Sequence, residues 1–215
     1  EMGPSKSGVI GMVAAAKGFR RTDPLGELSG LRFGVRIDQP GKLVRDFHTA
    51  QRPKQEKDGS ITWKALPLSY RYYVSDAVYL AVLEGDRELV EEIDRAVRSP
   101  AFPLYLGRRS CPPAGPIALG VFDGELEEVL ARHSWMASAW YQQRHRQRTV
   151  LLSTICDAPL GESGDELVRD VPVSFDPNRR EYAWRSVKRG TVEVDNPHGI
   201  VDGNGEHDPM EALGG

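Results

Sequence analysis

The sequence has few cysteines and no long apolar run. Its two cysteines, Cys111 and Cys156, lie far apart, with no CxxC spacing and no histidine at ligand intervals. A zinc site is therefore not expected, and both cysteines are expected to be reduced, small apolar residues. No stretch approaches the roughly 20 apolar residues of a membrane-spanning helix, and no signal peptide opens the chain. We expect a cytoplasmic protein without a membrane partner.

Familiar catalytic and cofactor-binding motifs are also absent. There are no paired carboxylates at metal spacing, no Gly-x-Ser-x-Gly elbow and no Rossmann fingerprint. The segment from Gly3 to Gly8 superficially resembles a phosphate loop, but it lacks the Gly-x-x-x-x-Gly-Lys-Ser/Thr pattern. We therefore predict no metal, no cofactor and no catalytic residue.

The chain lacks an excess of positive charge, since 28 Lys and Arg face 31 Asp and Glu, for a formal net charge of −3. This balance argues against indiscriminate nucleic-acid binding. The charges are nevertheless segregated, with basic residues in 36–57, 95–109, 144–148 and 179–189 and acids in 123–128 and 162–170. Such a distribution can place one positive groove on an acidic body, although simple mixing of surface charge is the alternative.

Length and composition indicate an ordinary globular chain. With 215 residues, 40% hydrophobic and 27% charged, it can bury a core as one elaborated domain or one domain with a small appendage. Periodicity predicts helices over about 7–17 and 87–98, the second capped by Asp86 and ended by Pro100. It predicts strands over 31–38, with one buried and one wet face, and over 76–83 and 117–122.

Two regions are less regular. From Asp46 to about Tyr70 the chain becomes basic and polar and is predicted to leave the core, with a hairpin closing at Asp58-Gly59. Short β candidates at 150–155, 171–175 and 181–187 suggest a second, mostly β region, followed by an irregular tail from Asn196.

The loop Gly107-Arg108-Arg109-Ser110 is the strongest functional signal. Gly107 allows a positive φ, the prolines at 112 and 113 stiffen the exit, and the two guanidiniums match phosphate or a guanine edge. A loop of this kind is suited to binding an anion. The alternative is a surface loop that happens to be basic.

The start of the first helix is a second candidate anion site. Ser5, Lys6 and Ser7 place two hydroxyls and an ammonium beside free backbone N–H groups, which suits a phosphate. Simple capping by Ser5 or Ser7 is the alternative.

The polar excursion offers basic and aromatic residues that can neutralise phosphates and stack bases. The candidate RNA contacts here are Arg45, Phe47, His48, Arg52 and Lys64. A tyrosine-rich strand packed on a core is the alternative. His48, near Tyr70, Tyr72 and Lys64 in sequence, is also the best candidate for a general acid or base.

Three segments carry a family resemblance: Pro4 to Met12, Arg45 to Thr49, and Tyr105 to Pro112. In order and content they are similar to the CasD family of the RAMP superfamily. CasD proteins are subunits of the antiviral type I-E CRISPR Cascade that cap the 5′ handle of the guide RNA (crRNA).

The resemblance implies an α+β protein with a ferredoxin-like (RRM-like) βαββαβ domain in residues 1–122. An inserted thumb hairpin would span about 48–70, and 123–215 would form a smaller β region. The family has an apolar strand before the first helix; this sequence starts directly at the helix, and we expect it to be truncated or renumbered.

The implied role is a non-catalytic subunit that binds the crRNA handle through Ser110 and the residues named above. The implied partners are the repeating backbone subunit, engaged by the thumb, the large subunit, and target DNA indirectly. Two alternatives stay open: a metal-independent crRNA-processing endoribonuclease of the same superfamily, and a ferredoxin-like assembly domain without RNA contact.

Overall fold

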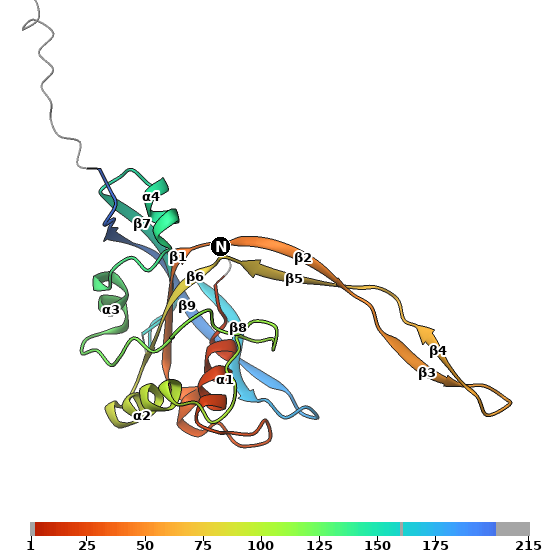
Figure 1. The fold of residues 1–215 in the computed structure, drawn as a ribbon. Coiled ribbons are helices and arrows are strands. Elements are labelled where there is room, and N and C mark those ends of the chain that lie inside the picture. Colours follow the sequence, from red (N-terminus) through yellow and green to blue (C-terminus); the bar gives the residue numbers. More distant parts are fainter. Residues whose placement is uncertain (1–2, 160, 201–215) are drawn as a thin grey trace, which may run out of the picture.

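The computed structural model describes residues 3–159 and 161–200 (Figure 1). They form an α+β body, built around a five-stranded sheet, and a long β arm that projects from one side of it. The strand order of the sheet is β6-β1-β7-β9-β8, and every neighbouring pair is antiparallel. The predicted mixture of helices and strands is therefore confirmed.

The strands of the sheet come from both halves of the chain. They are β1 (Arg32–Gln39), β6 (Val78–Glu84), β7 (Thr149–Asp157), β8 (Glu166–Ser174) and β9 (Glu181–Asp195). Strands were expected at all five places, although β8 and β9 are longer than predicted. Because β1 pairs with β7, the boundary expected at residue 122 does not separate two sheets.

Helix α1 (Lys6–Ala16) lies where periodicity predicted it. Ser5 is the N-cap, and its hydroxyl accepts a hydrogen bond from the Gly8 N–H at 3.1 Å. Val9 and Ile10 are buried, and Val9 packs with Phe33 and Val35 of β1. After the 3₁₀ turn η1 (Gly26–Gly30) the chain enters the sheet.

The prediction of one wet face for β1 was wrong, because both faces are covered. Leu126 of helix α3 (Leu126–Arg132) lies so close that a Cβ added to Gly34 would clash with its side chain. Arg36 and Asp38 are buried on the same side and satisfy each other, with Nε to Oδ1 at 2.7 Å and Nη2 to Oδ2 at 2.8 Å. Alternating polarity here marks an internal ion pair and not a solvent face.

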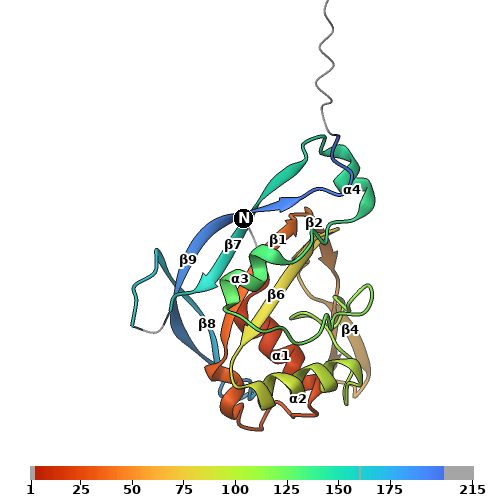
Figure 2. The ribbon, with the colours of Figure 1, turned by 90° about the vertical axis from the view of Figure 1, so that its left-hand side faces the viewer.

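Among the described residues, three further helices follow in the chain. Helix α2 (Arg87–Arg98) is capped by Asp86, as predicted. Neither α3 nor the short α4 (Ala139–Arg144) was predicted from the sequence. Figure 2 shows α4 and α2 at opposite ends of the body.

The strand predicted at 117–122 is not formed. These residues have no strand geometry, and Gly120 has φ 112°. The three prolines at 112, 113 and 116 lack N–H donors, which weakens pairing at the segment's start. No strand precedes α1 in the described part of the chain either, so the complete βαββαβ order is not observed there.

The predicted excursion is a two-part hairpin arm, longer than the expected thumb of 48–70. Its proximal half pairs β2 (Lys42–His48) with β5 (Ser69–Ser75), and its distal half pairs β3 (Gln51–Gln55) with β4 (Ile61–Ala65). The turn closes as predicted, with Glu56 N–H bonded to Ser60 O at 2.8 Å and Gly59 at φ 85°. Figure 1 shows the distal half far from the body.

Candidate nucleic-acid interface

The arginine loop is a closed turn. Leu106 N–H donates to Cys111 O at 2.9 Å, and Cys111 N–H donates to Arg108 O at 2.8 Å. Gly107 has φ 72°, so its predicted positive φ is confirmed. The turn leaves Arg108, Arg109 and Ser110 exposed to solvent.

The loop contacts the root of the arm through Tyr73 on β5. The guanidinium carbon of Arg108 lies 5.2 Å from the centroid of the Tyr73 ring, a cation–π distance. Ser110 Oγ lies 3.4 Å from the Tyr73 hydroxyl. Hydrogen bonding from Ser110, and then from Arg108, lowers the pKa of Tyr73. Tyr73 therefore joins the loop to the arm.

Tyr105 lies beside Arg109 of the loop and one further arginine. Arg21, in the turn after α1, and Arg109 both interact with its hydroxyl, and hydrogen bonding from Arg21 is the largest cause that lowers the pKa of Tyr105. Sequence reasoning missed Arg21 because it lies far from the loop along the chain. Backbone hydrogen bonds from Ala101 and Phe102 to the end of α1 bring the two segments together.

The proximal arm carries cations and aromatic rings on one face. Strand alternation places Arg45 and Phe47 of β2 on the same face as Tyr70 and Tyr72 of β5. The Arg45 guanidinium lies 5.0 Å from the Tyr70 ring centroid, and Phe47 is 64% exposed. Exposed rings beside guanidiniums are suited to stacking bases.

The distal arm separates basic from apolar side chains. Arg52 and Lys64 are directly opposite in the register, whereas Pro53 opposes Trp63 on the other face. Like charges directly opposite each other destabilise a strand pair. An anion bound between Arg52 and Lys64 would relieve this repulsion.

His48 does not share a face with the two nearby tyrosines. It pairs with Ser69 at the end of β2, while Phe47 pairs with Tyr70. Alternation therefore directs Tyr70 and Tyr72 away from the face that carries His48. The proximity in sequence does not produce a histidine–tyrosine pair.

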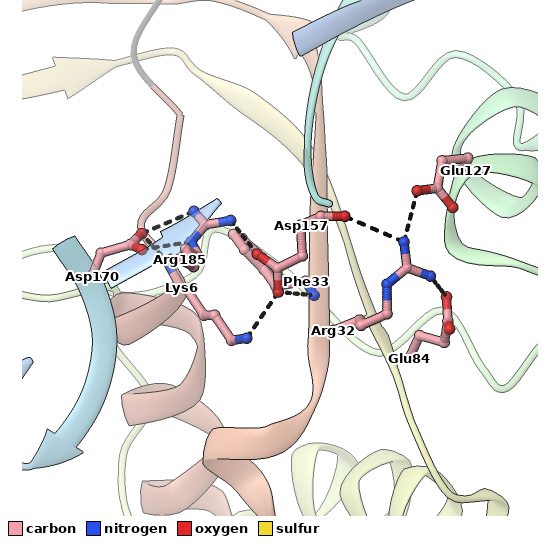
Figure 3. Close-up of polar contacts among 8 residues, drawn as sticks. All are labelled: Lys6, Arg32, Phe33, Glu84, Glu127, Asp157, Asp170 and Arg185. Carbon is pink, nitrogen blue, oxygen red and sulfur yellow. Dashed lines mark hydrogen bonds and ion pairs between the residues drawn. The ribbon is translucent and has the colours of Figure 1, made fainter. Parts of the chain in front are cut away.

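Lys6 requires a correction, because it is 5% exposed and engaged inside the protein (Figure 3). Its ammonium lies 2.8 Å from Asp157 Oδ2, and its backbone N–H donates to Asp170 Oδ2 at 2.8 Å. Arg185 bonds both carboxylates, at 2.6 Å to each. The α1 N-terminus thus already holds an anion, Asp170, and Lys6 is not available to a phosphate.

The contacts of Ser5 and Ser7 are with each other and with the start of α1. Ser5 is the helix cap, and its Oγ lies 3.2 Å from Ser7 Oγ. Capping, the alternative considered from the sequence, accounts for these contacts.

An acidic cluster on the other side of β1 surrounds a single arginine. Glu84, Glu125 and Glu127 converge around the Arg32 guanidinium. Figure 3 shows Arg32 with two of them, at 2.7 Å from Glu84 and 2.8 Å from Glu127. Arg32 thus compensates part of their charge within the protein.

Within residues 3–159 and 161–200, no helix has the length and apolar character needed to span a bilayer.

Comparisons with known proteins agree with this architecture. Residues 1–188 match the family model described as CRISPR-associated protein (Cas_Cas5). The CRISPR system Cascade subunit CasD of Escherichia coli (strain K12) is 30% identical over 131 residues, covering 54% of this chain and 58% of CasD. The alignment thus spans less than two thirds of that relative.

Two solved structures are similar over most of the chain. A chain of a CRISPR RNA-guided surveillance complex has a TM-score of 0.72 and 28% identity, covering 98% of this chain and 87% of its own length. A crystal structure of a Cas protein has a TM-score of 0.66 and 32% identity, with coverages of 92% and 84%.

Proposed function

The chain belongs to the Cas5 family of CRISPR-associated proteins, and we propose that it binds the 5′ handle of crRNA as a non-catalytic subunit of a type I-E Cascade complex. The observation that carries this proposal is the arginine loop docked on the arm. Arg108 and Ser110 contact Tyr73 of β5, so the loop and the arm form one basic and aromatic surface.

The chemistry of this surface fits single-stranded RNA. Guanidiniums neutralise phosphates, and the exposed rings of Phe47, Tyr70 and Tyr72 can stack on unpaired bases. The relatives support a complex of several subunits, since one similar structure is described as an RNA-guided surveillance complex. In the proposed assembly, the arm is the thumb of a ferredoxin-like domain, and it contacts the backbone subunit. The large subunit, which reads target DNA, is the second protein partner.

The placement of His48 supports a binding role over cleavage. A general acid or base must lie within hydrogen-bond reach of the reacting group, usually together with a partner. Tyr70 and Tyr72, two of the three partners considered from the sequence, lie on the opposite face of the hairpin. We therefore favour the binder over the endoribonuclease alternative.

One gel separates the three functions considered. Purified protein is mixed with a labelled repeat RNA, with and without divalent metal. A shifted, uncut band is expected. Site-specific cutting that is lost in His48→Ala would replace the proposal with the endoribonuclease, and neither cutting nor shift would favour an assembly domain without RNA contact.

A further inference from the structure

A second group of arginines lies outside the arginine loop and the arm. Residues 144–148, here called the basic segment, connect α4 to β7 and have the sequence Arg-His-Arg-Gln-Arg. The side chains of Arg144, Arg146 and Arg148 are all exposed. In Figure 1 the arm extends to the right of the body, whereas α4 lies at its upper left. The basic segment is therefore separate from the proposed handle site.

The three arginines of the basic segment have no acidic partners in the part of the chain that the structure describes. None of the ion pairs there includes Arg144, Arg146 or Arg148. Strand β9, which pairs with β7, carries Glu193 and Asp195 near its end, and neither forms an ion pair with the segment. Exposed guanidiniums without acidic partners attract an external anion.

The backbone of the basic segment is held in place by Asn196. The Asn196 side chain is buried, and its Nδ2 lies 2.7 Å from His145 O and 3.1 Å from Gln147 O. Its backbone N–H donates to Arg148 O at 2.8 Å. A Cβ at Gly199 would lie 2.5 Å from Gln147 O, so the chain passes too closely there for any side chain. The arginines thus project from a backbone that needs no ordering when an anion binds.

The aromatic ring beside the basic segment already holds a cation. The guanidinium carbon of Arg144 lies 5.9 Å from the ring centroid of Trp140, on α4. A ring face that holds a guanidinium is not free to stack on a base. The basic segment therefore offers charge and guanidinium hydrogen bonds, which suit phosphates, whereas the arm also offers exposed rings such as Phe47.

We propose that the basic segment binds the phosphodiester backbone of double-stranded DNA. A duplex keeps its bases paired inside and presents the phosphates of both strands, so it matches a surface of guanidiniums without a free ring face. Arg146 and Arg148 each bind a phosphate, and Asn196 is a positioning residue. Because phosphate contacts carry no sequence information, the contact is independent of base sequence. It goes beyond the function proposed above, in which only the large subunit meets target DNA.

The first test measures the salt dependence of binding of the full chain to a short fluorescein-labelled DNA duplex. Replacing Arg146 and Arg148 together with Ala should lower the logarithmic salt slope by about 0.9 for each phosphate that is no longer neutralised. Arg20→Ala combined with Arg180→Ala is the matched control, because it removes the same charge from two exposed arginines outside the segment. The control should retain the wild-type slope. Two duplexes of different sequence should give the same result.

The second test asks whether Asn196 acts through the arginines. Asn196→Ala removes the amide donor that holds the segment, so it should weaken duplex binding while all three arginines are present. In the background that lacks the Arg146 and Arg148 side chains, Asn196→Ala should have no further effect. Thermal unfolding shows whether each variant is folded. If Asn196→Ala unfolds, the arginine variants alone decide, since their changes lie on exposed side chains.

The outcomes separate this inference from the handle-binding proposal. If wild-type protein does not bind the duplex, or if the Arg146 and Arg148 variant matches its control, the inference is wrong. It is also wrong if that variant loses affinity for repeat RNA and keeps its affinity for the duplex. Lost binding to poly-L-glutamate with unchanged duplex binding would assign the segment to an acidic protein partner instead. Failure of wild type to bind repeat RNA would overturn the handle-binding proposal alone.

Discussion

At the scale of single residues, the surroundings of an arginine decide whether it stabilises the fold or can bind an external anion. Arg36 is fully buried, and its guanidinium bonds to Asp38 and to the carbonyls of Leu130, His133 and Ser134. It therefore ties β1 to the end of α3. Arg108 has the same functional group, but it is exposed and rests on a tyrosine ring. It remains able to bind an external anion.

Replacing Arg108 and Arg109 together with Ala should weaken binding to handle RNA. The logarithmic salt slope should fall by about 0.7 for each phosphate that the variant no longer neutralises. Fluorescence anisotropy at several salt concentrations measures both quantities. Arg98→Ala is a suitable control, since Arg98 is exposed but paired with Asp94 on α2. If the double variant kept the wild-type salt slope, the loop would not be part of the RNA-binding site.

The two cysteines should differ in reactivity. Burial raises the pKa of the Cys156 thiol to about 12, so this thiol should resist iodoacetamide until the protein unfolds. Cys111 lies partly exposed in the arginine loop and should react in the folded protein. Mass spectrometry after timed alkylation distinguishes the two sites. RNA should slow alkylation of Cys111; an unchanged rate with saturating RNA would contradict binding at the loop.

The same burial gives Cys156 a pH effect of defined sign. Since the folded thiol holds its proton more tightly than the unfolded thiol, its contribution to stability is complete below about pH 9. That contribution is lost as the pH rises toward 12. Cys156→Ala should reduce this alkaline decline in the free energy of unfolding, which urea denaturation at a series of alkaline pH values measures.

At the scale of elements, the arm stands apart from the body. All residues of β3 and β4 are exposed, and the distal hairpin pairs only with itself. The root is more constrained: Gly41 has φ 71°, and a Cβ there would clash with the carbonyl oxygen of Ser75. Asp76, on the returning side of the arm, has φ 54°. The direction of the arm is therefore fixed where it leaves the sheet.

Replacing residues 52–64 with a short Gly-Ser linker should leave the folded body intact. The change removes residues of the distal arm, which lies outside the core, so the free energy of unfolding should stay within about 0.5 kcal/mol of wild type. Urea denaturation measures this value, and co-purification of the tagged protein with the other Cascade subunits measures assembly, which should decrease. Normal assembly would show that the distal arm is not a partner contact, and failure to fold would show that it supports the body.

At the scale of the whole molecule, one buried ion cluster joins distant parts of the chain. Lys6 of α1, Asp157 of β7, Asp170 of β8 and Arg185 of β9 contact one another (Figure 3). Asp157 also accepts from the Phe33 backbone N–H of β1 at 2.9 Å. This network holds the first helix and four of the five strands together.

Arg185→Met should therefore destabilise the entire fold. The change leaves two buried carboxylates with fewer partners, and loss of one member of a buried ion pair typically costs about 3–5 kcal/mol. Urea denaturation provides the measurement. Arg87→Met, which breaks exposed pairs with Glu91 and Asp123, is the control and should change stability little. Equal stability of the two variants would show that the cluster does not hold the fold together.

The sequence by itself determined those local elements that carry a cap or a turn signal, and the conformation of the arginine loop at Gly107. The helices at α1 and α2 follow from apolar spacing and caps, and the hairpin turn follows from Asp58-Gly59. Gly107 was predicted to have a positive φ because glycine alone tolerates it easily. These features depend on residues close together in the chain.

Only the tertiary structure decided which charged groups face solvent and which segments meet. Lys6 was a candidate phosphate ligand, and Arg36 lies on the face of β1 that was expected to be wet, yet Asp157 and Asp38 pair with them in the interior. Arg21, far from the arginine loop in sequence, lies beside Tyr105 after folding. A strand was expected at 117–122, but a short apolar run forms a strand only when another strand pairs with it. Such pairings link residues far apart in the chain, and local patterns carry no information about them.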